Sequence, residues 1–135
     1  MKEIIAIIRP NKMNATKKAL EEKGFSSMTA MRVIGRGKQK GLLDDISPVI
    51  SEDIKRSISR SLSVFDYDKI KKEGARFIPK RLISLIVPDD KCKEIVDTII
   101  KTNQTGNIGD GKIFVLPVED AIRIRTGEKG DDAII

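Results

Sequence analysis

The chain has 135 residues, and its content of 39% hydrophobic and 34% charged residues is that of an ordinary globular protein. Because it has no histidine, it has neither a Ser-His or Cys-His catalytic pair nor a zinc site that needs imidazole, and one cysteine excludes an internal disulfide. The net charge of +6 favours acidic partners, but only 4% of the residues are aromatic, which argues against a sheet that stacks nucleic-acid bases.

The first predicted element is a strand over residues 4–10, with the sequence IIAIIRP. Its apolar run, Ile4 to Ile8, is too short for the apolar region of a signal peptide and far too short to span a membrane. We therefore expect a single domain over residues 1–135 that is cytoplasmic and has no membrane insertion, in agreement with the single cysteine.

A helix and a second strand follow this first strand. The helix is predicted over residues 11–24, with Asn14 as its N-cap, Leu20 facing the core and Gly24 as its stop signal. The second strand is predicted over residues 25–35.

The chain then has a long connection, residues 37–77, without a strand pattern. Connections longer than about 15 residues are uncommon in compact domains and are usually functional or disordered. Within it, residues 51–62 have the spacing of a short helix, with apolar positions at Ile54, Ile58 and Leu62. Two interpretations are equally favoured: a stretch that frays in water, and a helix that orders against a partner.

The second half of the chain repeats the plan of the first half. A strand is predicted over residues 82–88, a helix over 89–103 and a strand over 112–118. The helix is expected to be capped by Asp89 and Asp90. Its apolar stripe has the spacing i, i+3, i+4, i+7, i+8 and consists of Cys92, Ile95, Val96, Ile99 and Ile100.

Two βαβ units in tandem predict an α+β protein with the ferredoxin-like split βαβ architecture, in which both helices cover one face of a four-stranded antiparallel sheet. The segment AIRIRT, residues 121–126, is expected to add a short fifth strand. No helix remains for the second face of the sheet, so we expect other subunits to bury it.

The loop before the last long strand, TGNIGDGK, matches the pattern G-x-x-x-x-G-K. Ile113 stands where a nucleotide hydrolase needs Ser or Thr for magnesium, and the loop leads into a strand rather than a helix. Both departures argue against a P-loop hydrolase. The main-chain N–H groups of Gly106, Gly109 and Gly111 can still converge on an anion, and Lys112 adds a charge. The simpler alternative is a glycine-rich turn with a solvated lysine.

Two arginines favour the anion interpretation. On a strand, Arg123 and Arg125 would point to one face and Ile122 and Ile124 to the other. Paired guanidinium groups repel each other unless an anion lies between them, and their planar geometry suits phosphate oxygens. The loop and the arginines together predict a phosphate-binding site.

Four segments closely resemble the PII family of signal-transduction proteins. They are KEIIAIIRP at residues 2–10, MT and GRGKQKG within 28–41, FIPKRLISLIVPDD at 77–90, and TGNIGDGKIFV with IRIRTGE within 105–128. The resemblance covers nearly the whole chain except the inside of the long connection, which matches the target-binding T-loop of the family.

The resemblance implies a ferredoxin-like homotrimer whose clefts between subunits bind ATP or ADP. On the adenine side, the positions that match are Ile7, Thr29, Gly35 and Gly37. The phosphate loop matches Ile108, Gly109, Asp110, Gly111 and Lys112. The family's triphosphate-binding arginines match Arg123 and Arg125, and Lys38 stands where many members have arginine.

The resemblance also implies a second ligand, 2-oxoglutarate, which binds beside ATP through Mg²⁺. Gln39 matches the residue that helps to hold this metal and effector, Lys80 matches the lysine that pairs with the effector's carboxylate, and Gly109 is a third residue expected to bind 2-oxoglutarate. The residues alone have simpler interpretations: Thr29 is a good strand residue, Gln39 an ordinary loop residue and Lys80 a solvated lysine.

The long connection departs most from the family. It is longer than the usual T-loop and lacks the pattern around the modifiable tyrosine, because Tyr67 has a different context. A loop of this kind resembles the subgroup that inhibits nitrogenase directly in methanogens, often together with a second PII-like chain. We expect the contact to the target to come from Ile54, Lys55, Arg56, Ile58, Arg60 and Leu62.

We therefore expect a non-enzymatic sensor of ATP, ADP and 2-oxoglutarate that inhibits nitrogenase through its T-loop and releases it when 2-oxoglutarate is high. The first alternative is a regulator of another target, such as an ammonium transporter or glutamine synthetase. The others are a slow ATPase that uses the same cleft and a ferredoxin-like module that binds nucleic acid.

Overall fold

The computed structural model of the chain describes residues 1–37 and 77–135. Lys38, Gln39 and the predicted helix over residues 51–62 lie outside the described residues. So do the residues expected to bind the target, which are Ile54, Lys55, Arg56, Ile58, Arg60 and Leu62.

Four strands form one antiparallel sheet in the described part of the chain. They are β1 (Lys2–Ile8), β2 (Thr29–Gly35), β3 (Ile78–Val87) and β4 (Lys112–Pro117), and their order across the sheet is β2-β3-β1-β4. The isoleucine-rich runs of β1 and β3 form the two central strands, as expected for segments that are buried on one face and partly covered on the other. The predicted ferredoxin-like α+β fold is confirmed.

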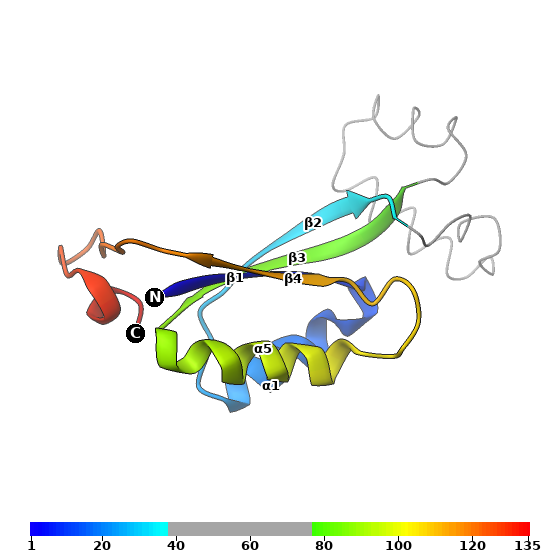
Figure 1. Cartoon of the computed structure of the whole chain (residues 1–135). Helices are drawn as coiled ribbons and strands as arrows, with labels where there is room; N and C mark the ends of the chain where they lie inside the picture. Colours follow the sequence, from blue (N-terminus) through cyan, green and yellow to red (C-terminus); the bar gives the residue numbers. More distant parts are fainter. Residues whose placement is uncertain (38–76) are drawn as a thin grey trace, which may run out of the picture.

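Two helices, α1 (Met13–Glu22) and α5 (Asp89–Asn103), cover the same face of the sheet (Figure 1). The core lies between these layers and consists almost entirely of aliphatic side chains: Ile4, Ala6, Ile8, Leu20, Ile83, Leu85, Val87, Ile95 and Ile99. The predicted stripe of α5 is confirmed for Ile95 and Ile99, whereas Ile100 at its margin is 42% exposed. Neither described helix is long and apolar enough to cross a bilayer.

The first turn of α1 differs from the prediction. A 3-10 turn over Pro10–Lys12 leads into the helix, so the N-cap is Lys12 and Asn14 lies inside the first turn without a capping role. The ring of proline favours a helical start at this point because its φ is preset and it needs no hydrogen-bond acceptor. The prediction for Asn14 is therefore wrong.

The end of α1 is the one predicted. Gly24 has a φ of +86°, and its N–H donates to Glu21 O over 2.9 Å. The next N–H, from Phe25, donates to Leu20 O over 2.9 Å, and the Phe25 ring packs against the core. These two bonds make a Schellman motif, in which glycine supplies the left-handed residue.

Helix α5 has the predicted bounds but a different cap. Pro88 occupies the N-cap position, and Asp89 and Asp90 lie in the first turn. Their charges still favour the positive end of the helix dipole. Asp89 also pairs with the amino group of Met1 over 3.0 Å, which lowers the pKa of the Asp89 carboxyl.

The predicted fifth strand is not formed. After β4 the chain makes a single antiparallel bridge between Ile122 and Lys129, closes a turn between them and ends in a 3-10 helix, Gly130–Ala133. The turn is stabilised by Gly127, whose φ is +74° and whose N–H donates to Arg123 O over 2.7 Å. The apolar and charged alternation of this segment therefore does not reflect strand geometry.

The face of the sheet opposite the helices has no covering layer among the described residues (Figure 1). Met31, Phe114 and Leu116 point to this side, because they share cross-strand rungs with Ile7, Ile5 and Glu3, which alternate with the buried residues of β1. Their exposed fractions are 51%, 49% and 38% for Met31, Phe114 and Leu116. We refer to this side of the sheet as the open face.

Candidate functional site

The glycine-rich loop between α5 and β4 follows a path that requires glycine. Gly106, Gly109 and Gly111 have φ values of +84°, +102° and +108°. At Gly111 a Cβ atom would lie 1.8 Å from the main-chain oxygen of Ile7, whereas at Gly106 it would meet nothing within 4 Å. Gly111 therefore lets the loop pack directly against β1, and Gly106 serves only the turn.

The centre of this loop is occupied by a carboxylate of the chain itself. Asp110 accepts hydrogen bonds from Thr105 N over 2.8 Å, from Thr105 Oγ1 over 2.5 Å and from Gly106 N over 3.0 Å. The bonds from Thr105 hold the pKa of the Asp110 carboxyl down at about 2. The N–H group of Gly106, which we expected to face an external anion, is thus bound to Asp110 instead.

Two cations hold the other side of the loop. Lys80 Nζ donates to Gly109 O over 2.6 Å, and Arg9 donates to Ile108 O over 3.0 Å and approaches Asp110 Oδ1 at 3.4 Å. Burial, followed by the charge of Arg9, lowers the pKa of Lys80, whose residue is only 9% exposed. Arg9, Lys80 and residues 108–112 form what we call the base cluster.

The sequence did not single out Arg9. Arg9 follows β1 directly and precedes Pro10. A charged residue at this position, where the proline ends the strand, is the signal that could have identified it. Lys80, by contrast, was identified only through the family resemblance, and the structure brings it to the predicted phosphate loop.

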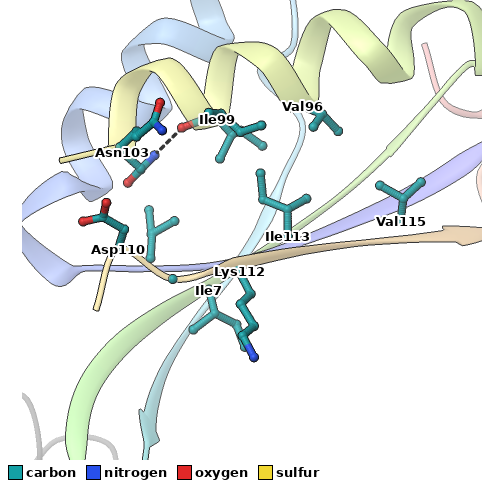
Figure 2. A pocket seen from close by; sticks show the side chains of 12 residues that line it. Ile7, Val96, Ile99, Asn103, Asp110, Lys112, Ile113 and Val115 are labelled. Atoms are coloured by element: carbon teal, nitrogen blue, oxygen red, sulfur yellow. Dashed lines mark hydrogen bonds between the residues drawn. The ribbon is translucent and has the colours of Figure 1, made fainter. Parts of the chain in front are cut away.

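The side chains near the base cluster are divided between the two faces of the sheet. In Figure 2, Ile113 and Val115 point towards α5 across a cavity of about 470 Å³, whereas Ile7 and Lys112 point away from the helix. Ile7 and Lys112 are cross-strand partners, and Lys112 is exposed. Ile7 and Lys112, which are both predicted to bind ATP, therefore lie on the open face.

Thr29 and Arg123 come together at a different place. They line one cavity of about 610 Å³ with Ser84, Ile86 and the last residues of the chain, 133–135. Ser84 is the cross-strand partner of Thr29 and donates to Glu3 Oε1 over 2.7 Å. We call this group the end cluster; Ser84 is a lining residue that the sequence did not indicate.

Arg123 is engaged by the chain itself. Its NH1 group pairs with Glu128, and its NH2 group donates to Asp132 O over 2.8 Å and to Ile135 O over 2.7 Å. Glu128 also accepts a hydrogen bond from Thr126 Oγ1 over 2.8 Å. The sequence pattern did not reveal Glu128 as a partner of Arg123, because only the turn between Ile122 and Lys129 brings the two side chains together.

The expected pairing of Arg123 with Arg125 rested on strand geometry and is wrong. The residues between Ile122 and Lys129 form a turn, in which Ile124 is fully exposed and Arg125 is exposed. Neighbouring residues of a turn do not alternate between two faces as they do in a strand. The phosphate-binding role expected for these arginines remains a prediction.

The residues predicted for ATP thus fall into two groups within one chain. Strand β2 runs from Thr29 at the end cluster to Gly35, a distance of about 20 Å for six residue steps. The base cluster and its cross-strand neighbour account for Ile7, Ile108, Gly109, Asp110, Gly111 and Lys112. Gly35 pairs with Ile78, two residues before Lys80, and Gly37 follows two residues after Gly35. Thr29 and Arg123 thus lie at the start of β2, whereas the glycine loop is bound by Lys80, the cross-strand partner of Val33 near the other end of this strand.

The sequence matches a protein-family model described as nitrogen regulatory protein P-II over residues 1–128. A relative from Methanobacterium ivanovii, described as nitrogen fixation nifHD region GlnB-like protein 2, is 51% identical and covers 100% of both chains. The protein of that description from Methanococcus maripaludis is 46% identical over 99% of this chain and 100% of its own.

More distant relatives carry the P-II name as well. Nitrogen regulatory protein P-II 1 of Escherichia coli K12 is 42% identical over 99% of this chain and 100% of its own. Among solved structures, the crystal structure of Arabidopsis thaliana PII bound to citrate is similar, with a TM-score of 0.67 and 29% identity over 98% of this chain and 88% of that one.

Proposed function

Because the chain belongs to the P-II family of nitrogen regulatory proteins, we propose that it is a trimeric sensor of ATP, ADP and 2-oxoglutarate without enzymatic activity of its own. The observation that carries this proposal is the division of the predicted ligand residues between the base cluster and the end cluster. A ring of copies would place the base cluster of one chain beside the end cluster of the next. Heterologous contacts of this kind close into a ring when the rotation between neighbouring copies is that of a cyclic assembly.

The chemistry of both clusters suits a nucleotide with several phosphates. Lys112 is exposed on the open face, and Gly109 and Gly111 carry no side chain that would block an approaching phosphate. A neighbouring copy would add the Arg123 guanidinium, whose planar geometry matches phosphate oxygens, and the hydroxyl groups of Thr29 and Ser84. The exposed apolar side chains of the open face would be buried in the same assembly.

Lys80 is the residue that would hold the carboxylate of 2-oxoglutarate. Its ammonium group is poorly solvated, as the lowered pKa indicates, and a carboxylate nearby would compensate this loss of hydration. Mg²⁺ would be held by the phosphates, the effector and Gln39, and would link the two ligands. Binding of the effector would therefore depend on the nucleotide.

Nitrogenase is the target that we propose. Two similar methanogen proteins carry names that place them in the nifHD region of nitrogen fixation. In this proposal the segment between β2 and β3 docks on nitrogenase when 2-oxoglutarate is low, and effector binding shifts the population away from the docking arrangement. A second PII-like chain would assemble with the trimer where inhibition needs it.

Nucleotide binding is tested by calorimetry on Arg123→Ala. We expect ATP binding to weaken by about 1.5–3 kcal/mol, the loss of a charge-assisted contact, while sedimentation still detects a trimer. Lys80→Ala should leave ATP binding in place and abolish the ATP-dependent binding of 2-oxoglutarate. Unchanged ATP affinity in Arg123→Ala would remove this arginine from the site.

The target is tested by replacing residues 42–75 with a short Gly/Ser linker. The trimer and ATP binding should persist, because loop-closure entropy changes slowly with length. Inhibition of purified nitrogenase, measured with ADP and without 2-oxoglutarate, should disappear. If the full-length protein does not inhibit nitrogenase even when a partner PII-like chain is added, the target is another protein, and the sensor proposal is judged on ligand binding alone.

A further inference from the structure

Two arginines face each other on the helix side of the sheet, the face opposite the one on which Lys80 of the base cluster lies. Arg32 of β2 and Arg81 of β3 are direct cross-strand partners. Arg81 alternates with Leu82 and lies on the same side of β3 as the buried Ile83, whereas Lys80 lies on the open face. Like charges that are directly opposite in an antiparallel pair destabilise a sheet, so this pair has a cost that the fold must offset.

The charge of this pair is not compensated within the described part of the chain. No ion pair of Arg32 or Arg81 with a carboxylate is found among residues 1–37 and 77–135. Arg81 NH1 is closed off from water and has no hydrogen-bond acceptor. Burial and then the charge of Arg32 lower the pKa of Arg81, which shows that its charged form is held in an unfavourable environment.

Arg32 and Arg81 lie where β1 ends and the sheet continues as the strands β2 and β3. Arg81 is still opposite Ile8, the last residue of β1, whereas Ile78 to Lys80 pair with β2 alone. From there β2 and β3 extend past the helices to the two ends of the segment 38–76 (Figure 1). Arg32 is exposed and Arg81 is partly exposed, so a group that approaches from outside can reach both guanidinium groups, although Arg81 NH1 itself is enclosed.

We propose that Arg32 and Arg81 form a receptor for an acidic side chain of the target protein, beside the segment that docks on it. Two guanidinium groups on adjacent strands offer parallel N–H donors to one carboxylate, which would compensate both charges at once. This proposal rests on the proposed function, because it assumes that a protein docks at this end of the sheet. It adds a contact on a face of the sheet that the ligand clusters do not use.

The geometry of the pair is tested by charge reversal without any target. Arg32→Glu replaces the repulsion by a cross-strand ion pair, and we expect the midpoint of thermal unfolding to rise by about 2–5 °C. Lys18→Glu, an exposed position of α1, changes the net charge by the same amount and should not raise the midpoint. The double variant Arg32→Glu with Arg81→Glu should lose the gain. An unchanged or lower midpoint for Arg32→Glu would show that the two side chains do not interact.

The receptor itself is tested by inhibition of nitrogenase. Arg32→Glu should weaken inhibition at least tenfold, although the variant is more stable and binds ATP like the wild type; Lys18→Glu should inhibit normally. If Arg32→Glu and Arg81→Glu inhibit as well as the wild type, the receptor proposal is wrong and the proposed function stands. If the wild type does not inhibit nitrogenase, the target assignment has failed, and with it the docking contact proposed here.

Discussion

The base cluster and the end cluster both hold cations predicted to bind ligands, but the chain satisfies them in different ways. In the base cluster, Lys80 and Arg9 donate mainly to main-chain carbonyl oxygens of the glycine loop. In the end cluster, Arg123 is paired with the carboxylate of Glu128, in addition to its bonds to the main-chain oxygens of Asp132 and Ile135. A carbonyl oxygen satisfies a hydrogen bond without cancelling the charge, whereas a carboxylate does both.

This difference indicates an order of events. The base cluster contains Arg9, Lys80, Lys112 and Asp110, and so keeps an excess of positive charge that would attract a phosphate group. The end cluster offers an arginine whose charge is already balanced by Glu128, so a ligand of Arg123 would have to displace a bond of the chain itself. In the proposed function, the base cluster would therefore be organised in advance, and the end cluster would have to rearrange.

The largest effect on stability is expected for a substitution in the glycine-rich loop of the base cluster. Gly111→Ala should lower the free energy of unfolding by about 3–4 kcal/mol, because the new methyl group overlaps the Ile7 carbonyl and the residue has a positive φ. Gly106→Ala has a similar φ but open space around it and should cost only about 1–2 kcal/mol. Chemical denaturation of both variants measures the difference, and equal losses would mean that the contact with β1 is unimportant.

A smaller effect is expected from releasing the arginine of the end cluster. Glu128→Gln removes the charge that competes with a phosphate, and ATP should bind about threefold to tenfold more tightly, or roughly 0.7–1.4 kcal/mol. Glu119→Gln, which makes the same change of charge at another exposed residue, is the control for calorimetry. Weaker binding in Glu128→Gln would indicate that the carboxylate positions Arg123 for its ligand rather than competing for it.

The smallest effect concerns the loss of stability at low pH that comes from Asp110 in the base cluster. The folded pKa of Asp110, about 2, lies below its ordinary value of 3.8, so its contribution to stability is present above about pH 4 and is lost as the pH falls towards 2. Asp110→Asn should remove this part of the acid dependence. An NMR titration of the Thr105 and Gly106 amide signals checks the midpoint, and a midpoint near 4 would contradict the contacts described.

The parts of the fold that depend on local patterns could be predicted from the sequence. The stripe of α5 predicts a helix with the observed bounds, and Gly24 ends α1 because a left-handed residue is needed there. The cap at Asn14 could not be predicted reliably, since a 3-10 turn starts the helix earlier. The fifth strand was mistaken because AIRIRT alternates like a strand, while Gly127 and Glu128 close it into a turn.

The site was predictable in its residue types but not in its partners. The carboxylate of Asp110 and the hydroxyl of Thr105 are visible in the sequence, but only the loop conformation shows that they bind each other. The repulsion between Arg32 and Arg81 depends on the register of two strands that are separated in the sequence by a long connection. Alternation within one segment carries no information about the strand beside it, so the facing of Arg32 and Arg81 could not be predicted.

Strand β4 forms one outer margin of the sheet, since among the described strands its main chain pairs with β1 alone. An isolated copy would therefore present unpaired N–H and C=O groups beside the half-exposed Phe114 and Val115, which is the kind of surface that nucleates aggregation. Lys112 at the start and Pro117 at the end of the strand act as gatekeepers, through a charge and a missing donor. Assembly would thus protect the protein from self-templated deposits as well as build its ligand sites, and subunits made in excess of their partners would be the ones at risk.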